Sequence, residues 1–527
     1  MTASERPNQP PKQRDPMDRD PVAPPRQVIE PLEGRILDPA TAMRIKGVLP
    51  RPTVYVGHRL LVAAEGFATA LDLLNRAAEG KGWRVIEDPT FEPWSVEVPD
   101  LDQPDRTVLV GRHRVLIEVV EGRAASAPDA WVLLQLARAL DTTGAVVGVN
   151  LDHIMFAMPT PMHDPFPMHD PFPMHDPFPM HDPFGATSSY VRPGSGGRQP
   201  VAFVGPKPFR VDDDKLDRLR PVVAILDTGC APHPWLNRAV DQSVTMDGPI
   251  GIADPTSDPE LIGDQVGALD GQLDTNSGHG TFIAGLIHQA CPNATILSWR
   301  LMNSEGPIAE SDWERAIGKI VKVVQAYVAG TGGHRIDILN LSMGYFHETA
   351  DDVDATMTAR LLLGALGAMG TLVVCAAGND STARPRFPAA LGPWEGGPAP
   401  AATRLPIVSV GALNPNGTQA LFSNAGRWVR AWETGAALLS TFPAFQGGYE
   451  PIARVSYDGK IREALDPDDF SGHFALWSGT SFAAPLLAGR IAKTLWRTMP
   501  ADEDTARATA IDRGWAALGT HTPIVPA

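Results

Sequence analysis

The sequence predicts an α/β protein with a mostly parallel sheet, and three segments carry this prediction. Residues 221–226 form a short apolar run that ends in Asp227 and a turn, as expected of a buried parallel strand. Residues 371–377 form a second apolar run, which leads into a Gly-Asn turn at Asn379. Residues 482–492 are apolar on all sides, which predicts a buried helix. Buried strands and a buried helix together favour the α/β class.

Ser481 stands at the start of this apolar helix, directly after a Gly-Thr turn. Pro485 is tolerated only near the first turn of a helix, where the backbone N–H has no intrahelical partner. Ser481 is therefore expected at the positive end of the helix dipole, beside free backbone N–H groups that suit a tetrahedral oxyanion. A serine hydroxyl alone is a weak nucleophile, so a base and an orienting acid are required elsewhere.

Both groups occur upstream of the serine. Asp227 ends the first strand, at the sheet edge where open α/β sheets place their sites. His279 begins a second helix rich in small residues, 279–285. Each residue alone also has a structural explanation, such as a turn residue for the aspartate or a helix cap for the serine. The three residues together favour nucleophilic catalysis.

Three motifs in this order resemble those of the subtilisin-like serine peptidase family: Asp-Thr-Gly at 227–229, His-Gly-Thr-x-x-Ala-Gly at 279–285 and Gly-Thr-Ser-x-Ala-x-Pro at 479–485. The resemblance covers roughly residues 201–500. It implies a three-layer αβα domain and an Asp227–His279–Ser481 triad that hydrolyses protein or peptide substrates through an acyl-enzyme. It implies no cofactor.

Two further segments match the same family. Asn379 occupies the position of the family's side-chain oxyanion donor. Residues 339–344 resemble the substrate-pairing strand, on which an extended peptide adds as a β-strand, so Ser342, Met343 and Gly344 are the implied substrate-binding residues. Residues 288–295 pass directly to the next strand, so the calcium loop that many members carry there is expected to be absent, and no metal ligand is assigned.

The chain of 527 residues is too long for one core. We expect a disordered, Pro-rich segment over 1–50, an α+β domain over 51–158, a linker over 159–200 and the peptidase domain over 201–527. In the α+β domain, helices are predicted at 67–78 and 127–140, and strands at 54–56 or 58–63, 83–87, 107–120 (one strand or a hairpin about Gly111-Arg112) and 145–158.

The resulting β-α-β-β-α-β order is that of a ferredoxin-like unit. Propeptides of the resembled family have this kind of small fold and directly precede the peptidase. Residues 51–158 are therefore a candidate intramolecular inhibitor, with a docking or sensing domain as the alternative.

The linker contains an internal repeat: Pro-Met-His-Asp-Pro-Phe occurs four times between Pro161 and Phe184. Two prolines in every six residues prohibit a regular helix and favour an extended chain. A spacer, or a proteolytic cleavage target, is the preferred interpretation. Metal binding by the four His-Asp pairs is the weaker one, because an extended repeat does not bring ligands to one point.

The formal net charge of −16 argues against nucleic acid or an anionic membrane as the main partner. No apolar window is long enough to span a bilayer, and the first residues have no hydrophobic core, so a cytoplasmic location is expected, with leaderless export left open. An inactive or catalytically restrained peptide-binding scaffold of the same fold is the alternative function. The presence of all four catalytic residue types favours the active enzyme.

Overall fold

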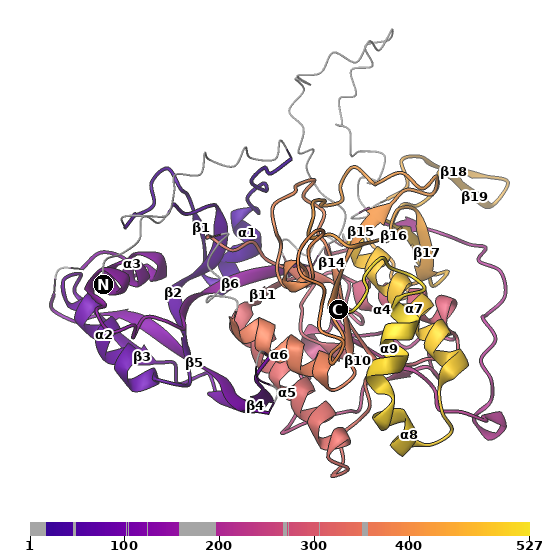
Figure 1. The fold of residues 1–527 in the computed structure, drawn as a ribbon. Coiled ribbons are helices and arrows are strands. Elements are labelled where there is room, and N and C mark those ends of the chain that lie inside the picture. The colour runs from indigo at the N-terminus through magenta and orange to yellow at the C-terminus, as the bar shows by residue number, and fades with distance from the viewer. Residues whose placement is uncertain are drawn as a thin grey trace, which may run out of the picture.

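The computed structural model describes residues 17–527 with the exception of 46–48, 102, 104, 124, 158–196, 267–270, 272, 305, 350–356 and 449. Two bodies lie side by side in Figure 1, an N-terminal domain of residues 17–157 and a C-terminal domain of residues 197–527. The predicted linker repeat lies outside the described residues.

A seven-stranded parallel sheet forms the centre of the C-terminal domain. In spatial order its strands are β16 (Ala431–Thr434), β15 (Ile407–Leu413), β14 (Leu372–Ala376), β12 (Ile338–Leu341), β8 (Val222–Asp227), β10 (Thr295–Arg300) and β9 (Val240–Asp241). The chain passes from β8 to β10 on one side and then to β12 on the other side of β8. The carboxyl end of β8 is therefore a topological switch point, the place where such sheets bind ligands.

Helices cover both faces of this sheet. On one face, α4 (His279–Ala290), α7 (Thr480–Thr498) and α9 (Ala510–Leu518) share a core with alternate residues of β8. On the other face, α5 (Glu310–Val328) and α6 (Met357–Ala368) share a second core with the remaining residues of β8. Successive side chains of one strand thus enter opposite layers. The predicted three-layer α/β fold is confirmed.

Shorter elements complete the C-terminal domain. Two strands lie at its boundary with the N-terminal domain: β11 (Pro307–Ala309) and β13 (Met343–Gly344). A small antiparallel sheet contains β7 (Gln199–Pro200), β17 (Leu438–Thr441) and β20 (Phe474–Trp477). A hairpin, β18 (Arg454–Tyr457) and β19 (Lys460–Glu463), lies in the segment between β17 and β20.

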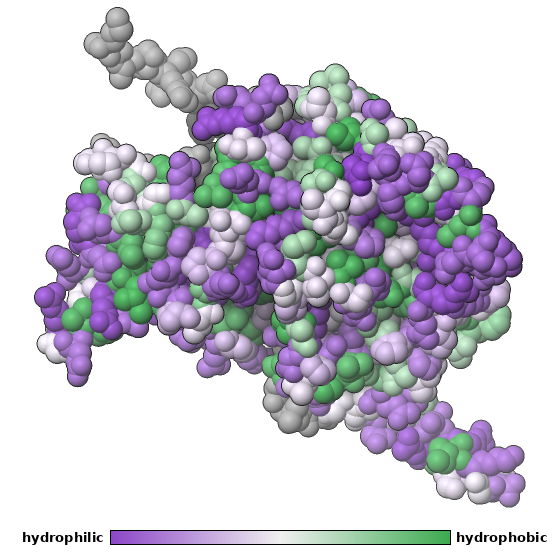
Figure 2. Space-filling view, turned by 90° about the horizontal axis from the view of Figure 1, so that it is seen from below, coloured by the Kyte–Doolittle hydropathy of each residue, from purple (hydrophilic) through white to green (hydrophobic). Residues whose placement is uncertain are grey.

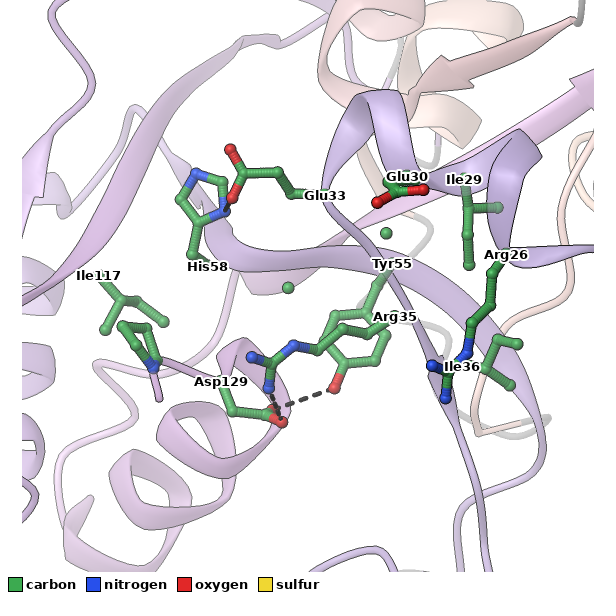
Figure 3. A pocket seen from close by; sticks show the side chains of 13 residues that line it. Arg26, Ile29, Glu30, Glu33, Arg35, Ile36, Tyr55, His58, Ile117 and Asp129 are labelled. Atoms are coloured by element: carbon green, nitrogen blue, oxygen red, sulfur yellow. Dashed lines mark hydrogen bonds and ion pairs between the residues drawn. The ribbon is translucent and has the colours of Figure 1, made fainter. Parts of the chain in front are cut away.

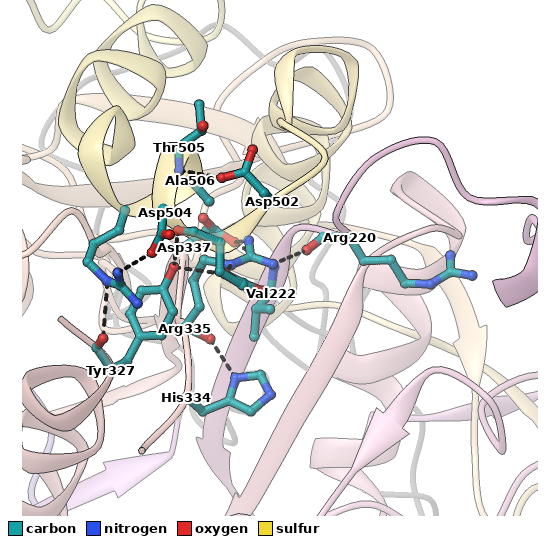
Figure 4. Close-up of polar contacts among 12 residues, drawn as sticks. Arg220, Val222, Tyr327, His334, Arg335, Asp337, Asp502, Asp504, Thr505 and Ala506 are labelled. Atoms are coloured by element: carbon teal, nitrogen blue, oxygen red, sulfur yellow. Dashed lines mark hydrogen bonds and ion pairs between the residues drawn. The ribbon is translucent and has the colours of Figure 1, made fainter. Parts of the chain in front are cut away.

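A buried charged network fixes the C-terminal helix α8 (Glu503–Ala508) to the amino end of the sheet (Figure 4). Arg335 binds Asp337 at 2.6 Å and Glu503 at 3.1 Å, and Asp337 accepts the backbone N–H of Val222 at the start of β8. A buried charge is tolerated only when it is paired in this way. The network therefore anchors the end of the domain opposite to the catalytic motifs.

The N-terminal domain has the predicted β-α-β-β-α-β order. Its elements are β2 (Thr53–Ala63), α2 (Phe67–Glu79), β3 (Trp83–Glu87), β5 (Thr107–Val119), α3 (Ala130–Leu140) and β6 (Val149–Ala157). The strands form an antiparallel sheet in the order β6-β2-β5-β3, and α2 and α3 share a core with it, as in a ferredoxin-like unit.

Two details of this domain differ from the predictions, and one alternative is decided. β2 is a single strand across Gly57, and β5 is the single strand of the two alternatives, running through Gly111. A further strand, β4 (Trp94–Pro99), pairs with β5, and the absent side chain of Gly111 lets the backbone of Trp94 approach closely. The glycine thus serves strand pairing and not a turn.

The prediction of disorder up to about residue 50 is wrong for residues 17–45. A short helix, α1 (Arg26–Ile29), and a 3-10 turn (Glu30–Leu32) lead into β1 (Gly34–Leu37), which pairs with β2. The segment is ordered because it adds to an existing sheet edge. It also walls a cavity of about 790 Å³, in which Arg35 and Tyr55 both bind Asp129, at 2.7 and 3.0 Å (Figure 3).

The surface seen in Figure 2 mixes hydrophilic and apolar side chains. Among the helices of the described residues, none combines the length and the hydropathy that a bilayer span requires.

Candidate active site

Asp227 and His279 form a buried hydrogen-bonded pair. Asp227 ends β8 and His279 begins α4, and the imidazole Nδ1 lies 2.7 Å from Asp227 Oδ1. The backbone N–H of Thr228 donates to the same carboxylate oxygen at 2.8 Å, which fixes the carboxylate plane. Among the described residues, Nε2 of His279 has no hydrogen-bond partner although the ring is fully buried. The pair therefore leaves one imidazole nitrogen available for proton transfer.

The turn before His279 depends on Gly278. Its φ is +82°, a left-handed conformation that glycine adopts without strain, and a Cβ there would collide with the ring of Phe442. This tight turn places His279 at the first position of α4 and faces it toward the end of β8.

Ser481 lies in the first turn of α7, and the next residue, Phe482, packs against the ring of His279 with ring centroids 5.2 Å apart. The hydroxyl of Ser481 lies 3.4 Å from the carbonyl oxygen of Ser342, and it is not hydrogen-bonded to His279. Catalytic hydrogen bonds of this kind often close only when a substrate is bound. The structure thus brings Asp227, His279 and Ser481 to one location.

Pro485 lies one turn further into α7 than the sequence predicts. In an uninterrupted helix, its N–H would bind the carbonyl oxygen of Ser481, but proline has no N–H to donate. The hydroxyl of Ser342 donates to that carbonyl instead, at 3.0 Å. The proline therefore couples the nucleophile to the strand that is predicted to bind substrate.

Asn379 follows β14 and is held by the turn before the nucleophile. Its side-chain oxygen accepts both the backbone N–H and the hydroxyl of Thr480, at 2.9 and 2.8 Å. The hydroxyl of Thr480 in turn accepts the N–H of Gly378 at 3.0 Å. These contacts fix the amide plane, so the –NH₂ group of Asn379 points away from Thr480.

Glu260 is a buried residue beside the catalytic pair that the motifs did not predict. Its carboxyl group accepts the hydroxyl of Thr228 at 2.5 Å, the backbone N–H of Gly280 at 3.0 Å and the hydroxyl of Thr281 at 2.5 Å. One side chain thus binds the residue after Asp227 and the two residues after His279. Glu260 comes from a loop without regular periodicity, so only the folded chain reveals it.

We expect the substitution Glu260→Gln to flatten the pH dependence of stability. Burial raises the pKa of Glu260 to about 8, so the folded protein holds this proton more tightly than the unfolded chain. The stabilisation is complete below the ordinary carboxyl pKa and is lost as pH rises toward 8. Melting temperatures measured between pH 5 and 9 should therefore fall more steeply with the parent protein than with the variant. Parallel curves would contradict the assigned protonation.

The predicted substrate-pairing residues lie at the boundary of the two domains. Met343 and Gly344 form β13, which pairs antiparallel with β6 of the N-terminal domain: Met343 faces Ala157 and Gly344 faces Phe156. β11 pairs with the same stretch of β6, so that Ile308 faces Met155. The end of β6 therefore lies hydrogen-bonded to both β11 and β13.

Comparisons with known proteins find one matching family model and several similar proteins. The model described as the subtilase family matches residues 220–513. An intracellular serine protease of Paenibacillus polymyxa is 26% identical over 285 residues, 51% of this chain and 65% of that protein. Mycosin-4 of Mycobacterium tuberculosis is 26% identical over 283 residues, 51% of this chain and 54% of that protein. The structure of fervidolysin from Fervidobacterium pennivorans, a keratinolytic enzyme related to subtilisin, aligns at 17% identity over 89% of this chain and 58% of that chain, with a TM-score of 0.42.

The chain spans about half to two thirds of the length of the curated relatives it matches. The family match covers more than half of the chain and includes the β8 strand end, the start of α4, Asn379 and the start of α7. The protein belongs to the subtilase family.

Proposed function

We propose that the protein is a serine endopeptidase, held in a restrained state by its own N-terminal domain. The observation that supports the peptidase activity is the hydrogen bond of 2.7 Å between Asp227 and His279, with Ser481 at the start of a neighbouring helix. The four residue types that acyl transfer needs are all present and buried at one sheet edge.

In the proposed mechanism, His279 Nε2 takes the proton of Ser481 as the hydroxyl attacks the scissile carbonyl carbon. Asp227 holds the imidazole through Nδ1 and stabilises its positive charge. The amide of Asn379 and the backbone N–H of Ser481 donate to the developing oxyanion. His279 then protonates the leaving amine, and a water molecule, activated by the same imidazole, hydrolyses the acyl-enzyme.

The restraint is supported by the position of β6. A peptide substrate is expected to add as a strand beside Ser342, Met343 and Gly344. The last residues of β6 occupy that edge through regular antiparallel pairing. Ser481 has no solvent exposure, so a substrate reaches it only after the residues that cover it move.

Further contacts support a specific docked interface. Arg112 on β5 forms a buried ion pair with Glu314 on α5, at 2.9 Å. Asp152 on β6 accepts the N–H and the hydroxyl of Ser311, both at 2.9 Å, and so caps the first turn of α5. Apolar residues of β4, β5 and β6 are part of the same core as α5 and α6. These features resemble a domain core more than a transient contact.

We expect Asn379→Ala to lower kcat by about 10²–10³-fold and to leave KM nearly unchanged, because the amide acts mainly on the oxyanion of the transition state. Steady-state kinetics on a peptide substrate measures kcat and KM separately. The background hydrolysis measured with Ser481→Ala is subtracted from the rates. A variant that lost affinity at unchanged kcat would assign Asn379 to substrate binding instead.

An inactive peptide-binding scaffold of the same fold remains the second candidate. It predicts peptide binding without turnover. Hydrolysis of a denatured protein substrate by the purified full chain, abolished by Ser481→Ala, decides between the two.

A further inference from the structure

Three buried side chains meet at the interface of the two domains: His153 on β6, and His347 and Glu348 in the loop after β13. One ring nitrogen of each histidine and one oxygen of Glu348 all lie within 4.8 Å of one another. The side chains of all three residues are at most 2% exposed. His153 and Glu348 are 195 residues apart in the chain, so only the docked fold brings them together.

We propose that this cluster is a binding site for a divalent transition metal of the zinc class, which links the N-terminal domain to the peptidase domain. Two imidazoles and one carboxylate form a donor set that Zn²⁺ prefers, and a second carboxylate oxygen or water completes four ligands. Ca²⁺ and Mg²⁺, which prefer oxygen ligands only, do not suit two imidazoles. No metal ligand is expected from the sequence motifs.

Glu310 supports this assignment from outside the ligand set. Its Oε2 lies 2.6 Å from Nδ1 of His153, while Nε2 of the same ring faces Glu348 at 2.7 Å. The hydroxyl of Tyr345 donates to the other oxygen of Glu310 at 2.6 Å. Metal-bound histidines usually donate their second ring N–H to a carboxylate held in this way, which fixes the ring and strengthens the ligand.

The charge of the cluster also favours a divalent cation. Two carboxylates, Glu310 and Glu348, face the imidazole of His153, so with both imidazoles neutral the cluster carries two negative charges. The nearby Arg112 is already matched by Glu314. Zn²⁺ in place of the proton on Nε2 of His153 brings the charge of the metal and the two carboxylates to zero.

The consequence is a metal clamp on the restraining domain. His153 belongs to β6, three residues before Phe156, which pairs with both β11 and β13. A metal bound to His153 and to the loop at 347–348 therefore holds β6 against the substrate-pairing edge. The clamping role rests on the proposed restraint, whereas metal binding itself does not.

The binding test uses the full-length Ser481→Ala protein, which cannot cleave itself. After dialysis against a chelator, it is titrated with Zn²⁺, and with Co²⁺ as a spectroscopic probe. We expect one tightly bound ion per chain and a Co²⁺ absorption spectrum of a four-coordinate site. His347→Ala and Glu348→Gln should lose this binding, and Glu310→Gln should weaken it by about 10–100-fold. His113→Ala removes a histidine of the N-terminal domain that pairs with Glu87 outside the cluster, and is the matched control.

Failure to bind Zn²⁺ stoichiometrically at micromolar concentration would overturn the proposal. So would binding that His347→Ala and Glu348→Gln leave unchanged, since the ion would then lie elsewhere, for instance on the His-Asp repeat. If circular dichroism shows that a variant is misfolded, two measurements on the parent protein still test the proposed site. They are the Zn²⁺-dependent rise in its melting temperature and the ligand-field spectrum of its Co²⁺ form.

A second arm tests the clamp with the catalytically competent chain. Zn²⁺ should slow peptide hydrolysis by the wild-type chain and not by His347→Ala. Zinc binding without this effect would confirm the site and refute the clamp. Absence of all hydrolysis would count against the proposed peptidase function while leaving the binding result intact.

Discussion

Ser481→Ala should abolish peptide hydrolysis, with a loss of about 10⁶-fold in kcat. The substitution removes the only atom that forms the acyl bond, and the oxyanion donors alone retain a small fraction of catalysis. The fold should persist, because the substitution removes a single hydroxyl group, which lies 3.4 Å from the carbonyl oxygen of Ser342, and alanine is a better helix former. Hydrolysis rates measure the loss of activity, and the far-ultraviolet circular dichroism spectrum measures whether the fold persists.

The matched control for this prediction is Ser471→Ala. Ser471 is an exposed residue in the loop before β20, in the same stretch of chain but not in the site. Its substitution should leave the rate unchanged. Hydrolysis that survives in a contaminant-free Ser481→Ala preparation would remove Ser481 from the mechanism.

Glu314→Ala should raise the activity of the full chain by weakening the docked interface. Arg112 is buried and binds Glu314 through two contacts, at 2.9 and 3.3 Å. Removing one partner of a buried ion pair leaves the other charge uncompensated, at a cost of about 3–5 kcal/mol. That cost applies to the docked state, because undocking exposes Arg112 to water. The docking equilibrium should shift by about 10²–10⁴-fold toward the free enzyme, and hydrolysis should rise until the free enzyme limits it.

Two variants control this experiment. Lys322→Ala removes a charge from the same helix, where Lys322 pairs with the exposed Asp247, and should leave activity unchanged. The double substitution Arg112→Met with Glu314→Leu replaces the buried pair by apolar groups and should restore the restraint. Equal activity of Glu314→Ala and the parent chain, with both folded, would show that this docking does not limit hydrolysis.

The elements that carry Asp227, His279 and Ser481 were predictable because each has a strong local signal. An apolar run ending in a turn marks β8, and the small-residue runs mark α4 and α7. Local patterns were less informative about Pro485, which lies one turn deeper in α7 because the side chain of Ser342, between β12 and β13, compensates the missing hydrogen bond.

Contacts between distant segments could not be read from the sequence. Glu260 lies in an irregular loop, and its role depends on the positions of Thr228 and Gly280 around it. Likewise, the order of residues 17–45 depends on the free edge of β2 to which β1 adds. Composition alone predicts disorder there, because it does not include the partner that a segment finds in the folded chain.

Fluorophosphonate labelling of the intact full-length protein, followed by mass spectrometric mapping of the adduct, tests whether Ser481 is an activated nucleophile that the N-terminal domain restrains. The reagent reacts only with a serine that is activated by its neighbours. We expect a single adduct on Ser481, formed slowly in the wild-type chain and faster in Glu314→Ala. A folded Glu314→Ala protein without an adduct on Ser481 would contradict this expectation.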